Sequence, residues 1–157
     1  MKEKTSMSLL IIAFIAFISL GLPDGLHGVA WPGIRSHFQV SIDAIGLVLI
    51  FVTAGYMTSS FFSGVLVRKL GIGGLLSASC AATATALCVY AVTPVWWFFV
   101  LIATLGGLGA GAIDAGINTY VAQHHSERIM QWLHAFFGIG ISLGPVIMTL
   151  GIPKQFT

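Results

Sequence analysis

Long apolar stretches, separated by short polar ones, run through nearly the whole of this chain. They lie near residues 8–30, 43–67, 73–92, 95–122 and 132–151. Each is close to the run of about 20 apolar residues that an α-helix needs to cross a bilayer. Inside the hydrocarbon layer every backbone polar group must be bonded within the protein, and a helix achieves this within one segment. The pattern therefore predicts an all-α integral membrane protein with about five transmembrane helices.

The composition leaves no room for a soluble domain. Hydrophobic residues make up 57% of the chain and charged residues only 8%, against roughly 25% charged residues in an ordinary soluble protein. The formal net charge of +2 is small and its charges are scattered, so nucleic acid is not an expected partner. We expect a single membrane domain over residues 1–157, surrounded by the lipid bilayer.

The basic residues indicate the orientation of the chain, because cytoplasmic loops carry an excess of Lys and Arg. The first apolar stretch has no small-x-small cleavage site, which favours a membrane helix over a signal peptide. We therefore expect a multi-pass protein of the plasma membrane with a cytoplasmic amino terminus and an outer carboxyl terminus. In this orientation five of the seven basic residues fall inside: Lys2, Lys4, Arg68, Lys69 and Arg128.

Small residues recur in the last two apolar stretches. Gly107 and Gly111 continue a spacing of four residues, which lets helix backbones approach closely. Gly138 and Gly144 make the last helix thin, and Pro145 bends it because proline cannot donate to the carbonyl four residues earlier. We assign these five residues to helix packing or gating.

Two acidic residues lie within apolar stretches, and they are the leading candidates for chemistry. A charge at membrane depth costs about 2.5–3.5 kcal/mol on insertion scales, so it tends to mark an ion or solute path. His27 follows Asp24 by three residues, Asn118 lies one helical turn beyond Asp114, and His134 is expected at a similar depth to Asn118. The structural alternatives are a solvated helix end for Asp24 and a helix-to-helix hydrogen bond for Asp114.

Neither a metal site nor a cofactor is expected. Cys80 and Cys88 lie about 12 Å apart along one predicted helix, too far to bridge each other. His124 and His125 lie in the most polar loop, where solvated side chains are more usual than metal ligands.

Four runs of residues together form a recognisable pattern: Gly21-Leu-Pro-Asp24-Gly-Leu-His-Gly-Val-Ala-Trp-Pro32, Gly111-Ala-Ile-Asp114-Ala-Gly-Ile-Asn118, Leu133-His134-Ala-Phe-Phe-Gly138 and Gly144-Pro145. This pattern resembles the major facilitator superfamily, and the nearest branch looks like the fucose/glucose/galactose proton symporters. In that branch an acid on the first helix and another on the fourth serve substrate binding and proton coupling. The resemblance implies these roles for Asp24 and Asp114. It also matches Asn118 to an asparagine after the second acid, and His134 to a polar cavity residue of the fifth helix.

The loop between the second and third apolar stretches keeps part of a superfamily motif. That motif reads Gly-x-Leu-x-Asp-Arg-x-Gly, and this chain keeps Gly64, Leu66, Lys69 and Gly71 at matching positions. Arg68 stands where the family has its acidic residue, so the loop departs from the family's latch. The charge rule applied above places this segment on the cytoplasmic side.

The family fold consists of two six-helix bundles with the solute between them, so five helices resemble an incomplete first bundle. We expect a truncated or partial amino-terminal half of a transporter for a small polar solute, such as a sugar, moved together with protons. The alternative is a non-transporting membrane module that assembles with or regulates another transporter half. The partner in either case is a second transporter half or a second copy of this chain. A remote alternative is an intramembrane protease, but those enzymes carry Gly-x-Gly-Asp where this chain has Gly111-Ala-Ile-Asp114. We therefore do not expect this protein to be an enzyme.

Overall fold

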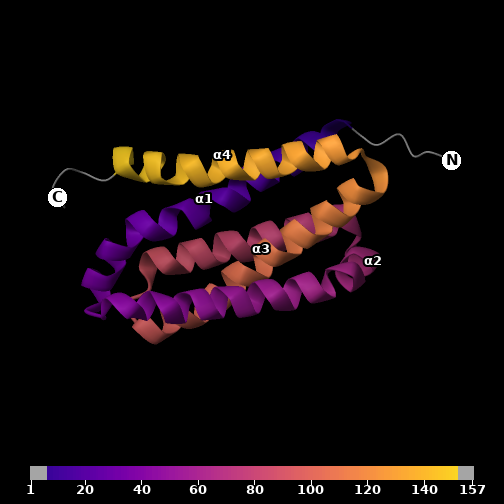
Figure 1. Cartoon of the computed structure of the whole chain (residues 1–157). Helices are drawn as coiled ribbons and strands as arrows, with labels where there is room; N and C mark the ends of the chain where they lie inside the picture. Colours follow the sequence, from indigo (N-terminus) through magenta and orange to yellow (C-terminus); the bar gives the residue numbers. More distant parts are fainter. Residues whose placement is uncertain (1–6, 152–157) are drawn as a thin grey trace. The chain divides into compact units, whose positions relative to one another are not determined.

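Four long helices make up the computed structural model of the protein, which describes residues 7–151 (Figure 1). All four are long and apolar enough to cross a membrane, which supports the predicted all-α membrane fold. Lys2 and Lys4, two of the basic residues used to predict the orientation, lie outside the described residues. The helices are α1 (Met7–Phe38), α2 (Ile45–Val92), α3 (Trp96–His124) and α4 (Glu127–Gly151), and a short 3-10 helix, η1 (Ile42–Ala44), precedes α2.

The prediction of five separate helices is wrong, because the stretches 43–67 and 73–92 belong to one element, α2. The polar residues between them end the apolar pattern, but helical structure continues on both sides of Gly71. Gly71 alone departs from helical geometry inside α2, with φ 68° and ψ 169°. A straight helix of 48 residues would be about 72 Å long, more than twice the hydrocarbon thickness.

The chain reverses direction at Gly71, which divides α2 into a first arm, 45–70, and a second arm, 72–92. The first arm runs in the same direction as α3. Gly107 lies against Val52, and Gly111, four residues later, lies against Ser59, so residue numbers rise together along both helices.

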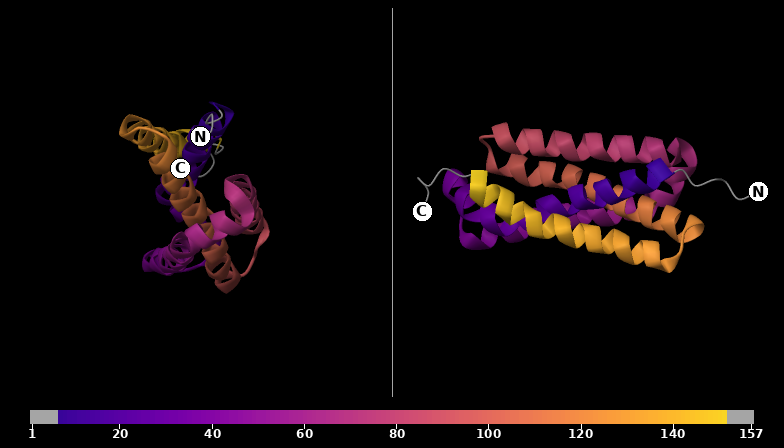
Figure 2. Two further views of the ribbon diagram at one scale, coloured as in Figure 1. Left: turned by 90° about the vertical axis from the view of Figure 1, so that its right-hand side faces the viewer. Right: turned by 90° about the horizontal axis from the view of Figure 1, so that it is seen from above.

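The second arm runs in the opposite direction to α3. Gly106 lies against Ala86, whereas Gly116, ten residues later in the chain, lies against Leu75. The two arms are therefore antiparallel to each other, and both lie along α3 (Figures 1 and 2). Glycine permits this turn because it has no Cβ atom to clash at positive φ.

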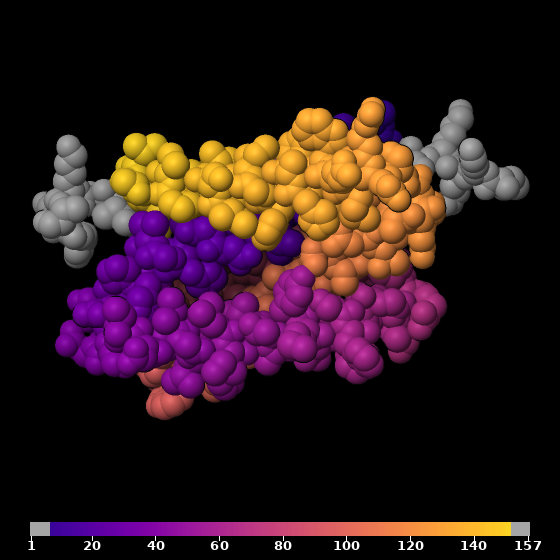
Figure 3. All heavy atoms as spheres, in the orientation of Figure 1, coloured from indigo at the N-terminus to yellow at the C-terminus, as the bar shows by residue number. Residues whose placement is uncertain are grey.

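The chain divides into two compact units, residues 1–33 with 121–157 and residues 34–120. In the first unit α4 packs along α1 (Figure 3). The backbone of Gly21 lies against Phe137 and Gly140 without space for a side chain. Phe17 is fully buried and contacts the ring of Phe137 edge to face, with 6.5 Å between the ring centroids.

The second unit has a core of aromatic and aliphatic side chains near the first residues of α2 and of α3. Val48, Val100 and Ala103 are almost fully buried there. Phe99 contacts Tyr90 of the second arm, with ring centroids 4.3 Å apart, and stacks on Trp96 at 5.9 Å. This core ties both arms of α2 to α3 near the loop that joins α2 to α3.

Large apolar side chains are also exposed along the helices. Phe61 and Leu150 are both 83% exposed. In water such a surface would drive association, whereas in a bilayer it meets hydrocarbon. The exposed apolar residues therefore fit a lipid-facing surface.

Candidate solute and proton site

Asp114 lies on α3 at the centre of a polar cluster in the second unit. The hydroxyl of Tyr56, on the first arm of α2, donates a hydrogen bond to Oδ2 of Asp114. The amide Nδ2 of Asn118 donates to Oδ1 of Asp114 at 3.0 Å. Both carboxyl oxygens therefore accept a hydrogen bond, one from a neighbouring helix and one from the next turn of α3.

Glycines bring the two helices of this cluster together. A Cβ atom at Gly107 would overlap the carbonyl oxygen of Val52, and one at Gly111 would overlap the carbonyl oxygen of Tyr56. The hydroxyl of Ser60 also donates to the carbonyl oxygen of Gly111 at 3.2 Å. The backbones therefore touch one turn from Asp114, which brings Tyr56 within reach of the carboxyl.

Tyr56 is the member of this cluster that the sequence analysis missed. It lies 58 positions before Asp114, and no spacing rule connects residues that far apart. The one sequence feature that could have pointed to Tyr56 is its position: it is an aromatic residue with a hydroxyl group, next to Gly55 in the middle of an apolar stretch. Small residues such as Gly55 mark the face of a membrane helix that packs against another helix.

Asp24 and His27 lie three residues apart on α1, about one helical turn, in the first unit. Asp24 is exposed and His27 half-buried. His134 is exposed on α4, and its ring meets Phe17 edge to face at 5.9 Å. Asp24 and His27 are therefore neighbours along one helix, and an aromatic ring lies beside His134.

Gly144 and Pro145, which were assigned to packing or gating, face α1 in the first unit. A Cβ atom at Gly144 would lie 2.6 Å from the carbonyl oxygen of Leu22, and Pro145 borders the space beside Gly25. Gly138, in contrast, has open space where a Cβ atom would lie.

The segment with Gly64, Arg68, Lys69 and Gly71 ends the first arm of α2 and forms its turn. All four residues are exposed. The Arg68 guanidinium extends back along the helix toward Gly64, where a Cβ atom would lie 3.9 Å from Nη1. The basic side chains of Arg68 and Lys69 are therefore exposed where α2 reverses direction.

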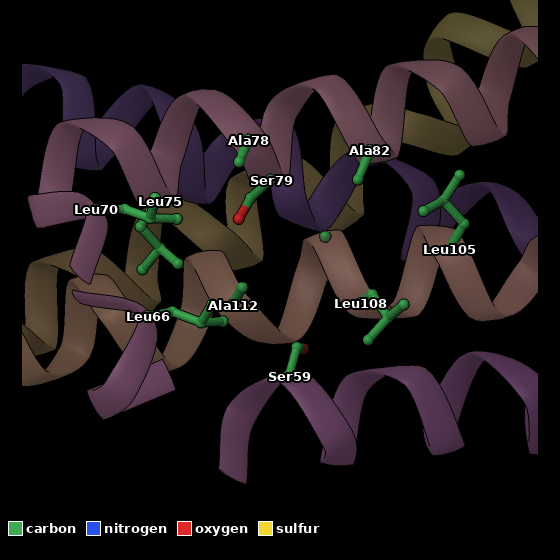
Figure 4. Close-up of a pocket in the computed structure, with 11 residues that line it drawn as sticks. Ser59, Leu66, Leu70, Leu75, Ala78, Ser79, Ala82, Leu105, Leu108 and Ala112 are labelled. Carbon is green, nitrogen blue, oxygen red and sulfur yellow. The ribbon is translucent and has the colours of Figure 1, made fainter. Parts of the chain in front are cut away.

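An apolar hollow of about 240 Å³ lies between the two arms of α2 and α3 (Figure 4). Leu66 and Leu70 of the first arm, Leu75 of the second and Leu108 of α3 contribute to its walls. Its lining offers almost no polar surface, so it suits hydrocarbon better than a polar solute. In residues 7–151, no three His, Cys, Asp or Glu side chains come together as a metal site.

Comparison with known proteins decides the family. The family model of the Major Facilitator Superfamily matches residues 9–156, almost the whole chain. The chain belongs to the major facilitator superfamily. The resemblance inferred from the four sequence runs is thereby confirmed.

One curated relative is the glucose/mannose transporter GlcP of Bacillus subtilis (strain 168), which is 20% identical over 140 residues. The match covers 88% of this chain and 35% of that transporter, so the chain spans about a third of the relative's length. No solved structure matches the chain significantly.

Proposed function

We propose that this superfamily member takes part in moving a small polar solute, such as a sugar, across the cell membrane together with protons. The observation that carries the proposal is Asp114, an ionisable side chain in an apolar helix, held on both oxygens by Tyr56 and Asn118. Ionisable groups at membrane depth are costly and mark ion or solute paths. The similarity to a glucose/mannose transporter supports a sugar as the solute class.

The proposed roles differ between the two acids. Asp114 takes up and releases the proton, because its carboxyl has partners that suit both charge states. Asp24, exposed beside His27 on α1, is suited to hydrogen-bond the hydroxyl groups of a solute. In this proposal Asn118 and His134 contribute further polar contacts along the path.

The proposed topology has α2 crossing the bilayer twice. Its arms of 26 and 21 residues are about 39 and 32 Å long at 1.5 Å per residue, each enough for the hydrocarbon layer. Together with α1, α3 and α4 this makes five crossings. The basic pair Arg68 and Lys69 then lies in the cytoplasm with the amino terminus.

The proposal includes a second bundle as partner. Alternating access requires one bundle of helices to move against another around the solute. In the proposal, a further transporter half or a second copy supplies this second bundle. The competing function is a module that assembles with or regulates another transporter half without carrying solute.

Uptake into proteoliposomes tests the proposal. The chain is reconstituted alone, and also together with the part of the Bacillus glucose/mannose transporter that the match does not cover. Labelled glucose and mannose are supplied under an imposed pH gradient and without one. Gradient-driven accumulation in either preparation, lost in Asp114→Asn, supports proton-coupled transport. If neither preparation accumulates solute, although the proteins insert and co-purify, the regulatory module is the better description.

A further inference from the structure

We propose that Tyr56 is a positioning residue for Asp114, which links the charge of this carboxyl to the packing of α2 on α3. The inference deepens the proposed function and rests on it only in taking Asp114 as the proton-binding group. It concerns a residue on another helix, 58 positions away, whose phenol donates to Asp114 Oδ2.

The backbone of Tyr56 is held in place independently of its hydroxyl. Its carbonyl oxygen lies directly against Gly111, and the hydroxyl of Ser60 bonds the carbonyl oxygen of Gly111 at 3.2 Å. The hydroxyl of Ser59 donates to the carbonyl oxygen of Tyr56 at 3.2 Å. The backbone of Tyr56 is therefore fixed at the contact between the helices, and the hydroxyl at the far end of its side chain reaches Asp114.

The hydrogen-bond chemistry of the cluster suits both states of the carboxyl. An ionised carboxylate only accepts hydrogen bonds, and here it receives donors from Tyr56 and from Asn118 Nδ2. A protonated carboxyl must also donate one. Asn118 Oδ1 is buried without a hydrogen-bond partner among the described residues, and a tyrosine hydroxyl can accept as well as donate.

Few other groups compete for the proton at this position in the second unit. On α3, the neighbours of Asp114 one turn away are Ala110 and Asn118, which do not titrate. The second arm of α2 meets the next turn of α3, at Gly116, with the apolar residues Leu75 and Ile72. Tyr56 is the titratable residue that the first arm directs at Asp114.

When Asp114 gains a proton, the Tyr56 bond must weaken or reverse. That bond joins the first arm of α2 to α3, next to the glycine contact. Protonation therefore alters the attraction between two helices, which is the kind of change that moves a helix in an alternating-access cycle.

The test reads the hydrogen bond directly, with no need for transport. The full chain is labelled with ¹³C-aspartate and its infrared spectrum is recorded in liposomes, where the Asp114 carboxylate band is the one lost in Asp114→Asn. Tyr56→Phe is expected to shift this band. Tyr90→Phe, which removes a phenol hydroxyl from the second arm of the same unit, is the matched control and is expected to leave the band in place. An unshifted band in Tyr56→Phe would overturn the inference.

A second measurement covers the case in which Tyr56→Phe does not fold. The otherwise unsubstituted chain is labelled with 3-fluorotyrosine, and the ¹⁹F signal of Tyr56 is compared with that in Asp114→Asn. The signals of Tyr90 and Tyr120 serve as internal controls. A Tyr56 signal that does not move on loss of the carboxylate overturns the inference. A shifted signal without any solute uptake would instead contradict the proposed function and leave the positioning role standing.

Discussion

Gly107 lies so close to the carbonyl oxygen of Val52 that a Cβ atom at this position would overlap it. The contact repeats one turn later, where Gly111 meets the backbone of Tyr56. In lipid, helices associate through such close backbone packing because no hydrophobic effect holds them together. The geometry of the Asp114 cluster therefore depends on having glycine, which has no side chain, at positions 107 and 111.

Gly107→Ala is expected to destabilise the second unit by about 1–3 kcal/mol, because the added methyl group must push α2 and α3 apart. Thermal unfolding in detergent, followed by tryptophan fluorescence, measures the loss. The matched control is Gly46→Ala, at a helical position with open space where a Cβ atom would lie. Equal melting temperatures for the two variants would show that α2 and α3 are less tightly packed at Gly107.

Gly71→Ala is expected to destabilise the chain by about 1–3 kcal/mol, since φ 68° with ψ 169° is a region that is essentially restricted to glycine. Gly73→Ala is the control, because Gly73 lies two residues later in helical conformation with open space around it. There alanine should be neutral or stabilising by up to about 1 kcal/mol. Unfolding curves of both variants provide the comparison, and a stable Gly71→Ala protein would argue against the tight reversal of α2.

Labelling of single cysteines tests the reversal of α2 in the membrane. In a background with Cys80→Ala and Cys88→Ala, cysteines at positions 39 and 95 are expected to react with an impermeant reagent from outside. A cysteine at position 69 is expected to react only after the membrane is opened. A continuous α2 that crosses once would place positions 39 and 95 on opposite sides, and that result would refute the folded-back arrangement.

Asp114→Asn is expected to abolish accumulation driven by a pH gradient in the reconstituted carrier, because an amide cannot take up and release the proton. Exchange of solute at equal pH should continue, since that reaction needs no net proton movement. Counterflow of labelled solute measures exchange, and uptake under the gradient measures coupling. Accumulation by the mutant would place the proton site elsewhere and leave Asp114 with a structural hydrogen bond.

Much of the fold follows from patterns along the chain. Runs of apolar residues near membrane length indicated helices, because a helix is the segment that satisfies its own backbone in lipid. The predicted number of separate helices was wrong because two of the predicted helices belong to α2. Arg68, Lys69 and Gly71 interrupt the apolar pattern, but hydropathy cannot show that a single residue turns the backbone while helical structure continues on either side.

The candidate site was open to sequence analysis only along each helix. Asp114 and Asn118 are four residues apart, and a helical period places them on one face. The nearness of Asp24 and His27 along α1 follows from the same short-range rule.

Apolar run length and the local motifs around Asp24 and Asp114 lie in consecutive residues, so they were enough to indicate an all-helical membrane chain of the major facilitator superfamily. Tertiary structure alone decided that Tyr56 bonds Asp114. That contact joins two helices far apart in the chain, and it depends on how closely Gly107 and Gly111 let their backbones approach.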